Sequence, residues 1–355
     1  MIISRTPFRI SFFGGGTDYP AWYREHGGAV LATTINKYCY ITVRYLPPFF
    51  DHKSRVVWSR VEMVQGVSEI QHPAVREALL FLDLHDGIEI HHDGDLPART
   101  GLGSSSSFTV GLLNALYALR GTMKSKRQLA LDAIHVEQER LRENVGAQDQ
   151  LSAAFGGFNR IDFRPDGEFR VSPVILPRER AMRLQDHLML FFTGFSRTAS
   201  EIVEEQLRTM ADKTRELSAM HQMVDQAEAL LSRGDLMEFG ELLDETWKLK
   251  RSLTNQISTA QIDSIYDTAR RAGATGGKLL GAGGGGFMLF FVKPELQPKV
   301  RAALKHLLHV PFRFDTSGSQ VIFYEPDGLH QAAEAQRQSE QTKKAPRAPR
   351  KTVAA

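Results

Sequence analysis

The chain of 355 residues contains a single cysteine, Cys39, and this scarcity excludes several kinds of protein. One thiol cannot form an intramolecular disulfide framework or a cysteine-based zinc site, and it suits a reducing compartment. Long apolar runs are also missing, since stretches such as FMLFFV at 287–292 fall far short of the roughly 18 residues of a transmembrane helix. The N-terminal sequence MIISRTPFRI has no apolar region typical of a signal peptide. We therefore expect a cytoplasmic protein that does not contact a membrane.

Most of the chain also lacks excess charge. The formal net charge is +3, but residues 334–355 hold six Lys or Arg and two Glu, so they contribute +4 and the other 333 residues sum to −1. Residues 331–355 are rich in Ala, Gln, Lys and Pro without apolar periodicity, which predicts a disordered basic tail. Because the body is nearly neutral and the tail has no aromatic residue, no nucleic-acid partner is expected.

What is present is an ordinary globular composition, with 42% hydrophobic and 24% charged residues. At about 150 residues per domain the length predicts two domains, which we place at 1–185 and 186–330 because a charged, weakly patterned stretch ends near residue 185. Periodicity predicts strands at 2–13, 88–92, 188–192 and 287–292 and a strand pair at 30–43. It predicts helices at 72–84, 126–143 and 260–272, and a long helical stretch at 198–250.

The first segment that carries chemistry is GLGSSSS at 101–107, which leads into an apolar helix. Glycines let the backbone approach a ligand closely, and the unpaired N–H groups at a helix start favour an anion, most naturally phosphate. No Gly-Lys-Ser/Thr ends the segment, so it is not a Walker A loop. The alternative is a serine-rich flexible loop.

The second segment is the glycine cluster GGKLLGAGGGG at 276–286, which contains seven glycines. Its formal G-x-G-x-x-G match is weak, because any glycine run produces one and because the strand follows the cluster instead of preceding it. We interpret the cluster as backbone packed closely against another backbone or a ligand. A flexible linker is the alternative.

Two carboxylates follow the first segment. Glu137 falls on the apolar stripe of its predicted helix, where a buried carboxylate needs a partner. A divalent metal or an inward salt bridge, for instance to Arg5 or Arg9, would supply one. Asp149 is expected in a loop just past this helix, where it could be a base, a ligand or a turn cap. Periodicity alone leaves these alternatives open.

Taken in order, these segments resemble the GHMP kinases, the family of galactokinase and of homoserine, mevalonate and phosphomevalonate kinases. The shared order is a basic N-terminal strand, a Pro97-x3-GLGSSSS loop, a helical Glu137, then Asp149 and a late glycine cluster, and it spans roughly residues 2–325. The resemblance implies a two-domain α+β fold. Its N-terminal α/β domain would be of the ribosomal S5 domain 2-like type, its C-terminal domain would be ferredoxin-like, and the active site would lie between them.

Within this family, FRISFFGGGTDYP at 8–20 and LMLFFTGFSRTAS at 188–200 closely resemble the D-glycero-D-manno-heptose 7-phosphate kinases. This branch implies ATP-dependent phosphorylation of the anomeric C1 hydroxyl of the heptose 7-phosphate to give the 1,7-bisphosphate, for nucleotide-activated heptose and surface glycans. It implies ATP and Mg²⁺ as cofactors and a small-molecule sugar phosphate as substrate, and it allows a homodimer. The alternatives are a 1-kinase for L-fucose or another unphosphorylated sugar and, after it, a non-catalytic sensor of the same fold.

The resemblance also implies roles for individual residues. Asp149 would be the catalytic carboxylate and Arg9 would lie beside the reacting hydroxyl, while Ser105 and Glu137 would bind Mg²⁺. The residues expected to hold ATP are Pro97, Gly101, Leu102, Gly103, Ser104, Ser105, Ser106 and Ser107. The residues expected to contact the sugar substrate are Gly15, Gly16, Thr17, Asp18, Thr193, Arg197, Gly283 and Gly284.

One departure from the wider family bears on specificity. Galactokinases have RVNLIGEHTD where residues 9–18 read RISFFGGGTD, so a Glu-His pair is replaced by Gly15-Gly16. The change removes negative charge and opens space, which is compatible with a substrate that carries its own phosphate. Arg197, with Thr193 and Ser196, is the predicted partner of that phosphate, because a guanidinium matches phosphate geometry. Two mechanisms remain open, with Asp149 as the base or with an arginine that lowers the hydroxyl pKa while Asp149 orients the substrate.

Overall fold

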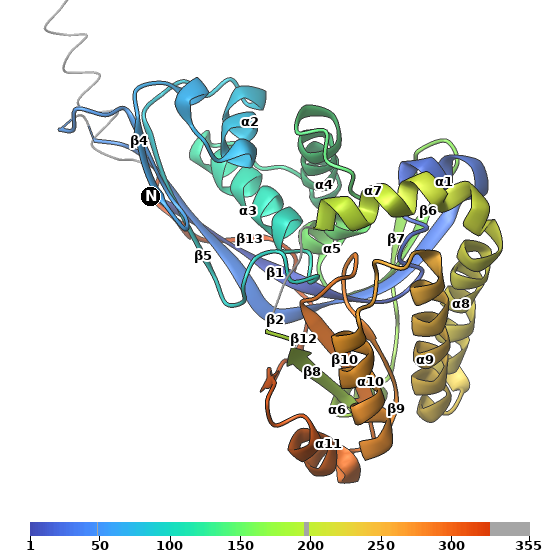
Figure 1. Ribbon diagram of the computed structural model, residues 1–355. Helices are drawn as coiled ribbons and strands as arrows, with labels where there is room; N and C mark the ends of the chain where they lie inside the picture. Colours follow the sequence, from blue (N-terminus) through green and yellow to red (C-terminus); the bar gives the residue numbers. More distant parts are fainter. Residues whose placement is uncertain (48, 195–198, 327–355) are drawn as a thin grey trace, which may run out of the picture.

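The computed structural model describes residues 1–47, 49–194 and 199–326, and it contains two β-sheets with their covering helices (Figure 1). The larger sheet has nine strands and the smaller has four. Within the described residues, no helix combines the length and apolar character needed to span a membrane.

The larger sheet is built around two long antiparallel strands, β1 (Ile2–Phe13) and β2 (Gly28–Tyr45). Its path continues from β2 through β5 (Ile88–Gly94) and β3 (Ser54–Val57) to β4 (Val61–Val64), and β13 (Gln320–Tyr324) flanks β1 at the other edge. The strands β6 (Phe158–Phe163), β7 (Phe169–Pro173) and β12 (Phe314–Asp315) lie off this path.

The prediction of a strand pair at 30–43 is wrong, because these residues lie within the single strand β2. No turn divides this strand at Asn36-Lys37. The pairing of β1 with β2 instead shifts register there, from Pro7 opposite Tyr38 to Phe8 opposite Ile35. Asn36 and Lys37 thus form a bulge that bends the strand without reversing it.

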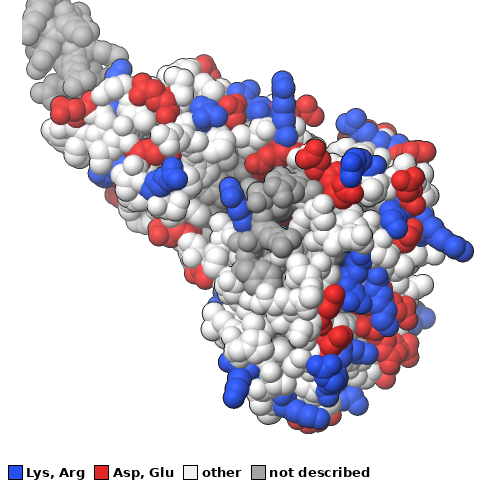
Figure 2. All heavy atoms as spheres, viewed as in Figure 1, with Lys and Arg blue, Asp and Glu red and all other residues white. Residues whose placement is uncertain are grey.

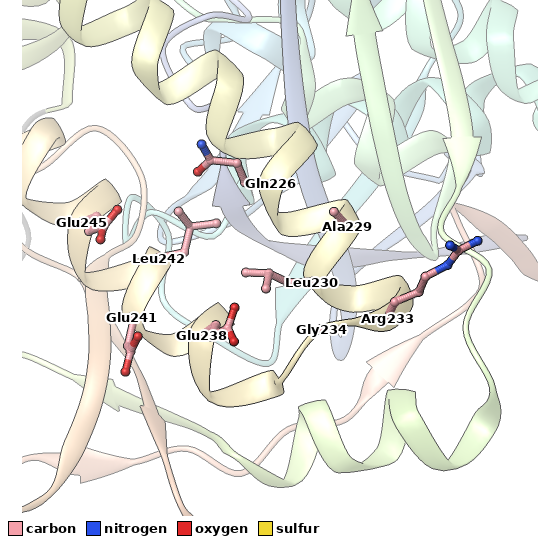
Figure 3. A pocket seen from close by; sticks show the side chains of 9 residues that line it. All are labelled: Gln226, Ala229, Leu230, Arg233, Gly234, Glu238, Glu241, Leu242 and Glu245. Carbon is pink, nitrogen blue, oxygen red and sulfur yellow. The ribbon is translucent and has the colours of Figure 1, made fainter.

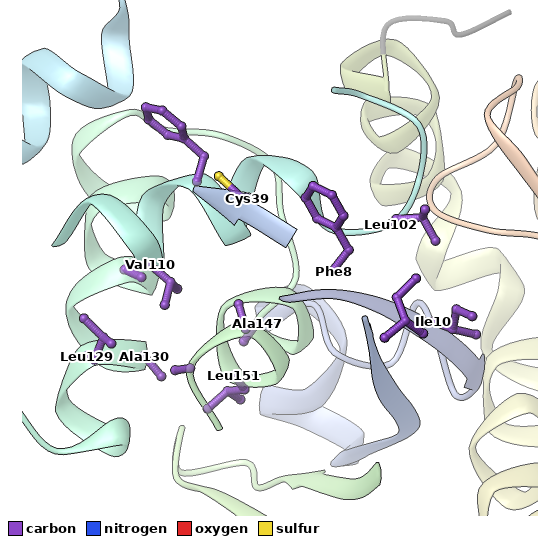
Figure 4. Close-up of a cluster of buried hydrophobic side chains, with 14 of the residues drawn as sticks. Phe8, Ile10, Cys39, Leu102, Val110, Leu129, Ala130, Ala147 and Leu151 are labelled. Atoms are coloured by element: carbon purple, nitrogen blue, oxygen red, sulfur yellow. The ribbon is translucent and has the colours of Figure 1, made fainter. Parts of the chain in front are cut away.

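Helices α2 (Pro73–Phe81), α3 (Ser104–Leu119), α4 (Lys126–His135) and α5 (Gln148–Phe155) gather on one face of the larger sheet (Figure 1). Their apolar side chains form a core with the sheet, which includes Phe8 and Ile10 of β1, Val110 of α3 and Leu151 of α5 (Figure 4). Cys39 is buried in the same core and acts as a small apolar residue.

The smaller sheet has the order β11-β8-β10-β9 and is antiparallel. Its strands are β8 (Leu188–Phe192), β9 (Ala274–Leu279), β10 (Phe287–Val292) and β11 (Leu308–His309), and α11 (Gln297–Ala303) connects the last two. This order and connection are those of a ferredoxin-like domain, which confirms the predicted fold class. Alternate residues of β10 enter two apolar cores, Leu289 on one face and Met288 on the other, which explains why the strand is apolar throughout.

The long helical stretch predicted at 198–250 is divided into α7 (Ala199–Thr209), α8 (Thr214–Arg233) and α9 (Leu236–Leu253). Gly234 ends α8, and the Asp235 side chain caps α9 by accepting from the Met237 N–H. The predicted helix at 260–272 is confirmed as α10 (Ala260–Ala272). Two shorter helices are α1 (Pro20–His26) and α6 (Arg178–Asp186).

Helix α9 and the strands β12 and β13 connect the two halves of the chain. Phe239 of α9 packs edge-on against Phe12 and Phe13 of β1, with ring centroids 5.6 and 5.1 Å apart. The strands β12 and β13, which the predicted division at residue 185 would assign to the second domain, pair with β2 and β1 of the larger sheet.

The glycine cluster packs against the loop that precedes α3. A side chain at Gly101 would collide with the Leu280 carbonyl, and one at Gly281 would collide with the backbone of Gly101. The Phe287 N–H also donates to the Thr100 carbonyl at 3.2 Å. The cluster is therefore not a flexible linker but backbone in close contact with backbone, as the glycine content predicts.

This contact predicts that Gly281→Ala destabilises the protein more than Gly121→Ala does. Both glycines have a positive φ, 76° and 65°, so both variants carry the strain of a left-handed alanine. Gly121 has open space around it, whereas Gly281 does not, and the collision should cost about 1–3 kcal/mol more. Thermal unfolding of the two variants measures the difference, and equal losses would contradict the tight contact.

Candidate active site

A cavity of about 510 Å³ is lined by segments from both halves of the chain. Its walls come from β1 and the turn after it, the loop before α3, the segment 142–149, α7, α9 and the glycine cluster. The predicted site residues that line it are Arg9, Gly15, Gly16, Asp18, Gly101, Gly103, Ser104, Ser105, Ser106, Asp149 and Gly283.

A second hollow, of about 790 Å³, lies between α8 and α9 and contains none of the predicted site residues (Figure 3). Glu238, Glu241 and Glu245 line one side of it. On the face drawn in Figure 2, Lys and Arg are interspersed with Asp and Glu over both halves of the molecule. Such mixing differs from the one-sided basic surface typical of nucleic-acid-binding proteins.

The loop before α3 presents backbone donors to the cavity. Gly103 is the N-cap residue of α3 with φ 73°, and no side chain caps the first-turn N–H groups. Ser104 instead accepts a hydrogen bond from the Arg99 N–H at 3.0 Å, and Ser107 donates to the Pro7 carbonyl at 2.9 Å. The serines thus fix the loop to its surroundings, and the free N–H groups and helix dipole favour an anion.

Glu137 is fully buried next to this loop. Ser106 Oγ and Gln150 Nε2 both donate to its Oε2, the former at 2.8 Å, while its Oε1 has no partner among the described residues. Burial raises the pKa of Glu137 to about 7. The salt bridges considered from the sequence do not form, because Arg9 pairs with Asp149 and Arg5 with Gln320.

Glu137 does not lie on a continuous α-helix to residue 143. The helix α4 ends at His135, and Val136–Arg140 forms a π-helical turn. Such turns are rare and occur frequently at functional sites.

These groups fit a magnesium ion. Mg²⁺ is usually held by one or two carboxylates together with substrate phosphates, and the orphaned Oε1 of Glu137 beside a hydroxyl meets that description. In the described part of the chain, no three His, Cys, Asp or Glu side chains form a metal site of their own. The hydroxyl that contacts Glu137 belongs to Ser106 and not to the predicted Ser105, which is exposed.

Arg9 and Asp149 form a two-pronged ion pair in the cavity. Arg9 is buried, and its Nε and one terminal nitrogen donate to the two carboxylate oxygens at 2.7 and 2.9 Å. The other terminal nitrogen donates to the Gly101 carbonyl at 2.7 Å. A Cβ at Gly103 would lie 3.4 Å from Asp149 Oδ2, so the carboxylate adjoins the loop at 99–103 before α3, the candidate anion-binding loop.

Asp149 lies in the first turn of α5 and not in a loop, which corrects the prediction. The helix forms because Leu151 and Ala154 bury against the larger sheet and its neighbours. The helix start directs the carboxylate into the cavity, and a rigid element fixes it there.

Asp18 is a second buried carboxylate at the same end of the cavity. It accepts hydrogen bonds from the N–H groups of Gly16 at 3.0 Å and Gln148 at 3.4 Å. Burial and then repulsion from Asp149 raise the pKa of Asp18 to about 6. The two carboxylates therefore lie close enough to interact, as a pair that contacts one substrate would.

Several predicted residues support the site without lining the cavity. The Thr17 hydroxyl donates to the carbonyls of Gly14 and Ala29, and the Thr193 hydroxyl donates to the Gly286 carbonyl at 3.0 Å. The remaining ones in this group are Pro97, Leu102, Ser107, Glu137 and Gly284. Arg197 and Ser196 lie outside the described residues.

Two lysines in the cavity wall were not predicted. Lys250 of α9 and Lys278 of β9 are both buried, and burial lowers the pKa of Lys250 to about 8. The signal was present in the periodicity, because Lys250 lies three residues from both Trp247 and Leu253, which are buried. Lys278 is likewise a charged residue inside an otherwise apolar and glycine-rich segment.

Comparison with known proteins agrees with this geometry. The GHMP kinases N terminal domain matches residues 68–157, which include the anion-binding loop, Glu137 and Asp149. The GHMP kinases C terminal domain matches residues 227–309, which include Lys250 and the glycine cluster.

Individual relatives cover most of the chain. It is 29% identical over 319 residues to the D-glycero-alpha-D-manno-heptose 7-phosphate kinase of Campylobacter jejuni subsp. jejuni serotype O:2, with 86% of this chain and 93% of the relative covered. It is 27% identical over 352 residues to the L-fucokinase/L-fucose-1-P guanylyltransferase of Bacteroides fragilis, with 86% of this chain but 36% of the relative covered.

A solved structure, a D-glycero-D-manno-heptose 1-phosphate kinase from Bacteroides thetaiotaomicron, matches with a TM-score of 0.73 at 25% identity. The match covers 92% of this chain and 100% of that one. With both family domains present in order around one cavity, the chain belongs to the GHMP kinases, a family of ATP-dependent phosphotransferases.

Proposed function

We propose that the protein uses ATP and Mg²⁺ to phosphorylate the anomeric C1 hydroxyl of D-glycero-D-manno-heptose 7-phosphate, giving the 1,7-bisphosphate. The observation that carries the proposal is the Arg9–Asp149 pair beside the loop before α3, because phosphoryl transfer to a hydroxyl needs an acid and a cation next to bound phosphates. The similarity to a heptose 7-phosphate kinase over most of the chain supports the choice of sugar.

The geometry suits phosphoryl transfer, which needs positioning and charge neutralisation more than covalent chemistry. The N–H groups at the start of α3 would hold phosphate oxygens, and Glu137 with Ser106 would hold Mg²⁺. When bound, the metal supplies positive charge to the phosphates. Arg9 would contact the transferred phosphoryl group from the side of Gly101, and Asp149 would accept the proton of the C1 hydroxyl.

Gly15, Gly16 and Asp18 line the cavity and would form its acceptor end. Asp18 would bind sugar hydroxyls, and the two glycines leave room for the acceptor. A 1-kinase for L-fucose is the second candidate, favoured by the similarity to part of an L-fucokinase/L-fucose-1-P guanylyltransferase. The two candidates differ in whether the acceptor carries a phosphate.

A panel of acceptors separates these candidates. We expect the enzyme to consume ATP fastest with D-glycero-D-manno-heptose 7-phosphate and much more slowly with the free heptose, L-fucose and galactose. An ATP-consumption assay measures the rates, and NMR of the product identifies the phosphorylated carbon. Faster turnover of a free sugar, or phosphate on a carbon other than C1, would contradict the proposal.

Asp149→Asn is expected to lower kcat by about 10²–10⁴-fold, because the amide cannot accept the hydroxyl proton. ATP affinity should stay within about threefold, since Asn retains an acceptor for Arg9 and leaves the loop in place. Asp162→Asn is the matched control, because Asp162 pairs with Arg160 away from the cavity. A near-normal kcat in the Asp149 variant would show that Asp149 is not the base and would leave only its role in orienting the substrate.

Glu137→Gln tests the metal assignment through both stability and activity. The folded-state pKa of Glu137, about 7, lies above its ordinary value of 4.5, so its contribution to stability is present below pH 4.5 and is lost as the pH rises through 7. In metal-free solution above pH 7 the free energy of unfolding of the variant should therefore exceed that of the wild type by about 1–3 kcal/mol. In acid the two free energies of unfolding should become equal.

The same variant should need at least tenfold more Mg²⁺ for half-maximal turnover. Denaturant unfolding in chelator at several pH values and a Mg²⁺ titration of the rate provide the two measurements. A variant with normal Mg²⁺ dependence would show that Glu137 serves the fold alone.

A further inference from the structure

Lys250 and Lys278 have no role in the mechanism above, although both lie buried in the cavity wall. Lys250 lies near the C-terminal end of α9, and its ammonium donates to the carbonyls of Gly281 and Leu279, the latter at 3.4 Å. Lys278 lies on β9 and donates to the Phe12 carbonyl at 2.7 Å. Lysine is almost never fully buried unless it is paired, so each position requires an explanation.

No acid in the described part of the chain pairs with either lysine. Three carboxylates line the same cavity. Asp149 is held by Arg9, Asp18 is held by backbone N–H groups, and Glu143 interacts with Arg99. Burial lowers the pKa of both lysines, and the Arg9 guanidinium lowers it further. Lys250 also lowers the pKa of Lys278, while Asp18 acts in the opposite direction on Lys250. The wall therefore holds more positive charge than its own acids balance, at a cost in desolvation.

The two ammonium groups belong to the acceptor end of the cavity. Phe12, whose carbonyl Lys278 contacts, lies in β1 three residues before Gly15, and Lys250 interacts with Asp18 of the turn that follows β1. The neighbouring Ser11 also lines the cavity, and its buried hydroxyl has no hydrogen-bond partner among the described residues. A free hydroxyl and two unbalanced cations at one place make a suitable site for an anion.

We propose that Lys250 and Lys278 bind the acceptor's own phosphate and so select phosphorylated sugars over unphosphorylated ones. This inference rests on the proposed function and adds the residues that choose its substrate. A lysine ammonium binds phosphate as a point charge, and the low dielectric of a buried wall strengthens the attraction. The two backbone carbonyls that hold Lys250 also keep its side chain in place before the acceptor arrives, so little side-chain entropy is lost on binding.

The test compares Lys250→Met and Lys278→Met with Lys248→Met. Methionine keeps most of the side-chain length and removes the charge. Lys248 is the matched control, because it lies on the same helix, is exposed, and pairs with Asp244 outside the cavity. Each protein is assayed with heptose 7-phosphate and with the free heptose, and its ATP affinity and thermal unfolding are measured alongside.

For the two cavity variants we expect the KM for heptose 7-phosphate to rise roughly 10- to 100-fold, as when a hydrogen bond to a charged group is lost. The rate with the free heptose and the ATP affinity should change by less than about threefold, and thermal stability should be unchanged or higher, since an unpaired buried charge has been removed. Lys248→Met should match the wild type throughout.

An equal loss with both acceptors, a fall in kcat at unchanged KM, or no change would overturn the lysine assignment. The KM and kcat values with heptose 7-phosphate decide the matter if the free heptose is not turned over. A wild-type enzyme that acts on heptose 7-phosphate while both variants behave normally would leave the proposed function standing without this inference.

If the wild type acts on a different sugar phosphate and the variants lose that activity selectively, the heptose is wrong and the lysine assignment stands. A wild-type preference for an unphosphorylated sugar would overturn both.

Discussion

The guanidinium of Arg9 is the group on which the geometry of the site depends. It holds both oxygens of Asp149 on α5 and the carbonyl of Gly101 in the anion-binding loop, so three segments far apart in the sequence meet at one planar side chain. The fork shape of the group fixes orientation as well as distance. Because Gly101 is packed in turn against Gly281, the same contact aligns the second half of the chain with the first.

The charged side chains buried in and beside the cavity destabilise the folded protein electrostatically. Arg9, Asp18, Glu137, Lys250 and Lys278 are all buried, and of these five only Arg9 forms a salt bridge. Burial shifts the pKa of the other four toward the neutral form, which is the response expected when a protein does not supply a counter-charge. Phosphoryl transfer brings its own charges of both signs, so a wall that is incompletely balanced in the free protein becomes balanced with ligands bound, and binding should stabilise the fold.

Much of the fold could be predicted where local pattern and local chemistry agree. The predicted helix at 260–272 forms with these bounds, because Thr259 caps it and Gly273 ends it, and the predicted strand at 287–292 forms because it is apolar on both faces. The strand pair at 30–43 was wrong because the outcome depends on pairing with β1: the same Asn36-Lys37 that could have formed a turn was absorbed as a bulge. Asp149 likewise lies in a helix because Leu151 is buried against the rest of the fold, which the local sequence does not show.

The site residues also differ in whether the local sequence or the long-range packing determines their position. A loop that acts through its own backbone is visible in its residues, which is why GLGSSSS was identified as an anion site. Which serine reaches Glu137 depends instead on the phase of α3, and that phase is set by its start after Gly103, which turns Ser106 inward and leaves Ser105 exposed. For Lys250 the periodicity already indicated a buried face. The carbonyls that hold its ammonium, however, come from a strand end that reaches α9 only through the order β8-β10-β9, so its role could be inferred only once that order was known.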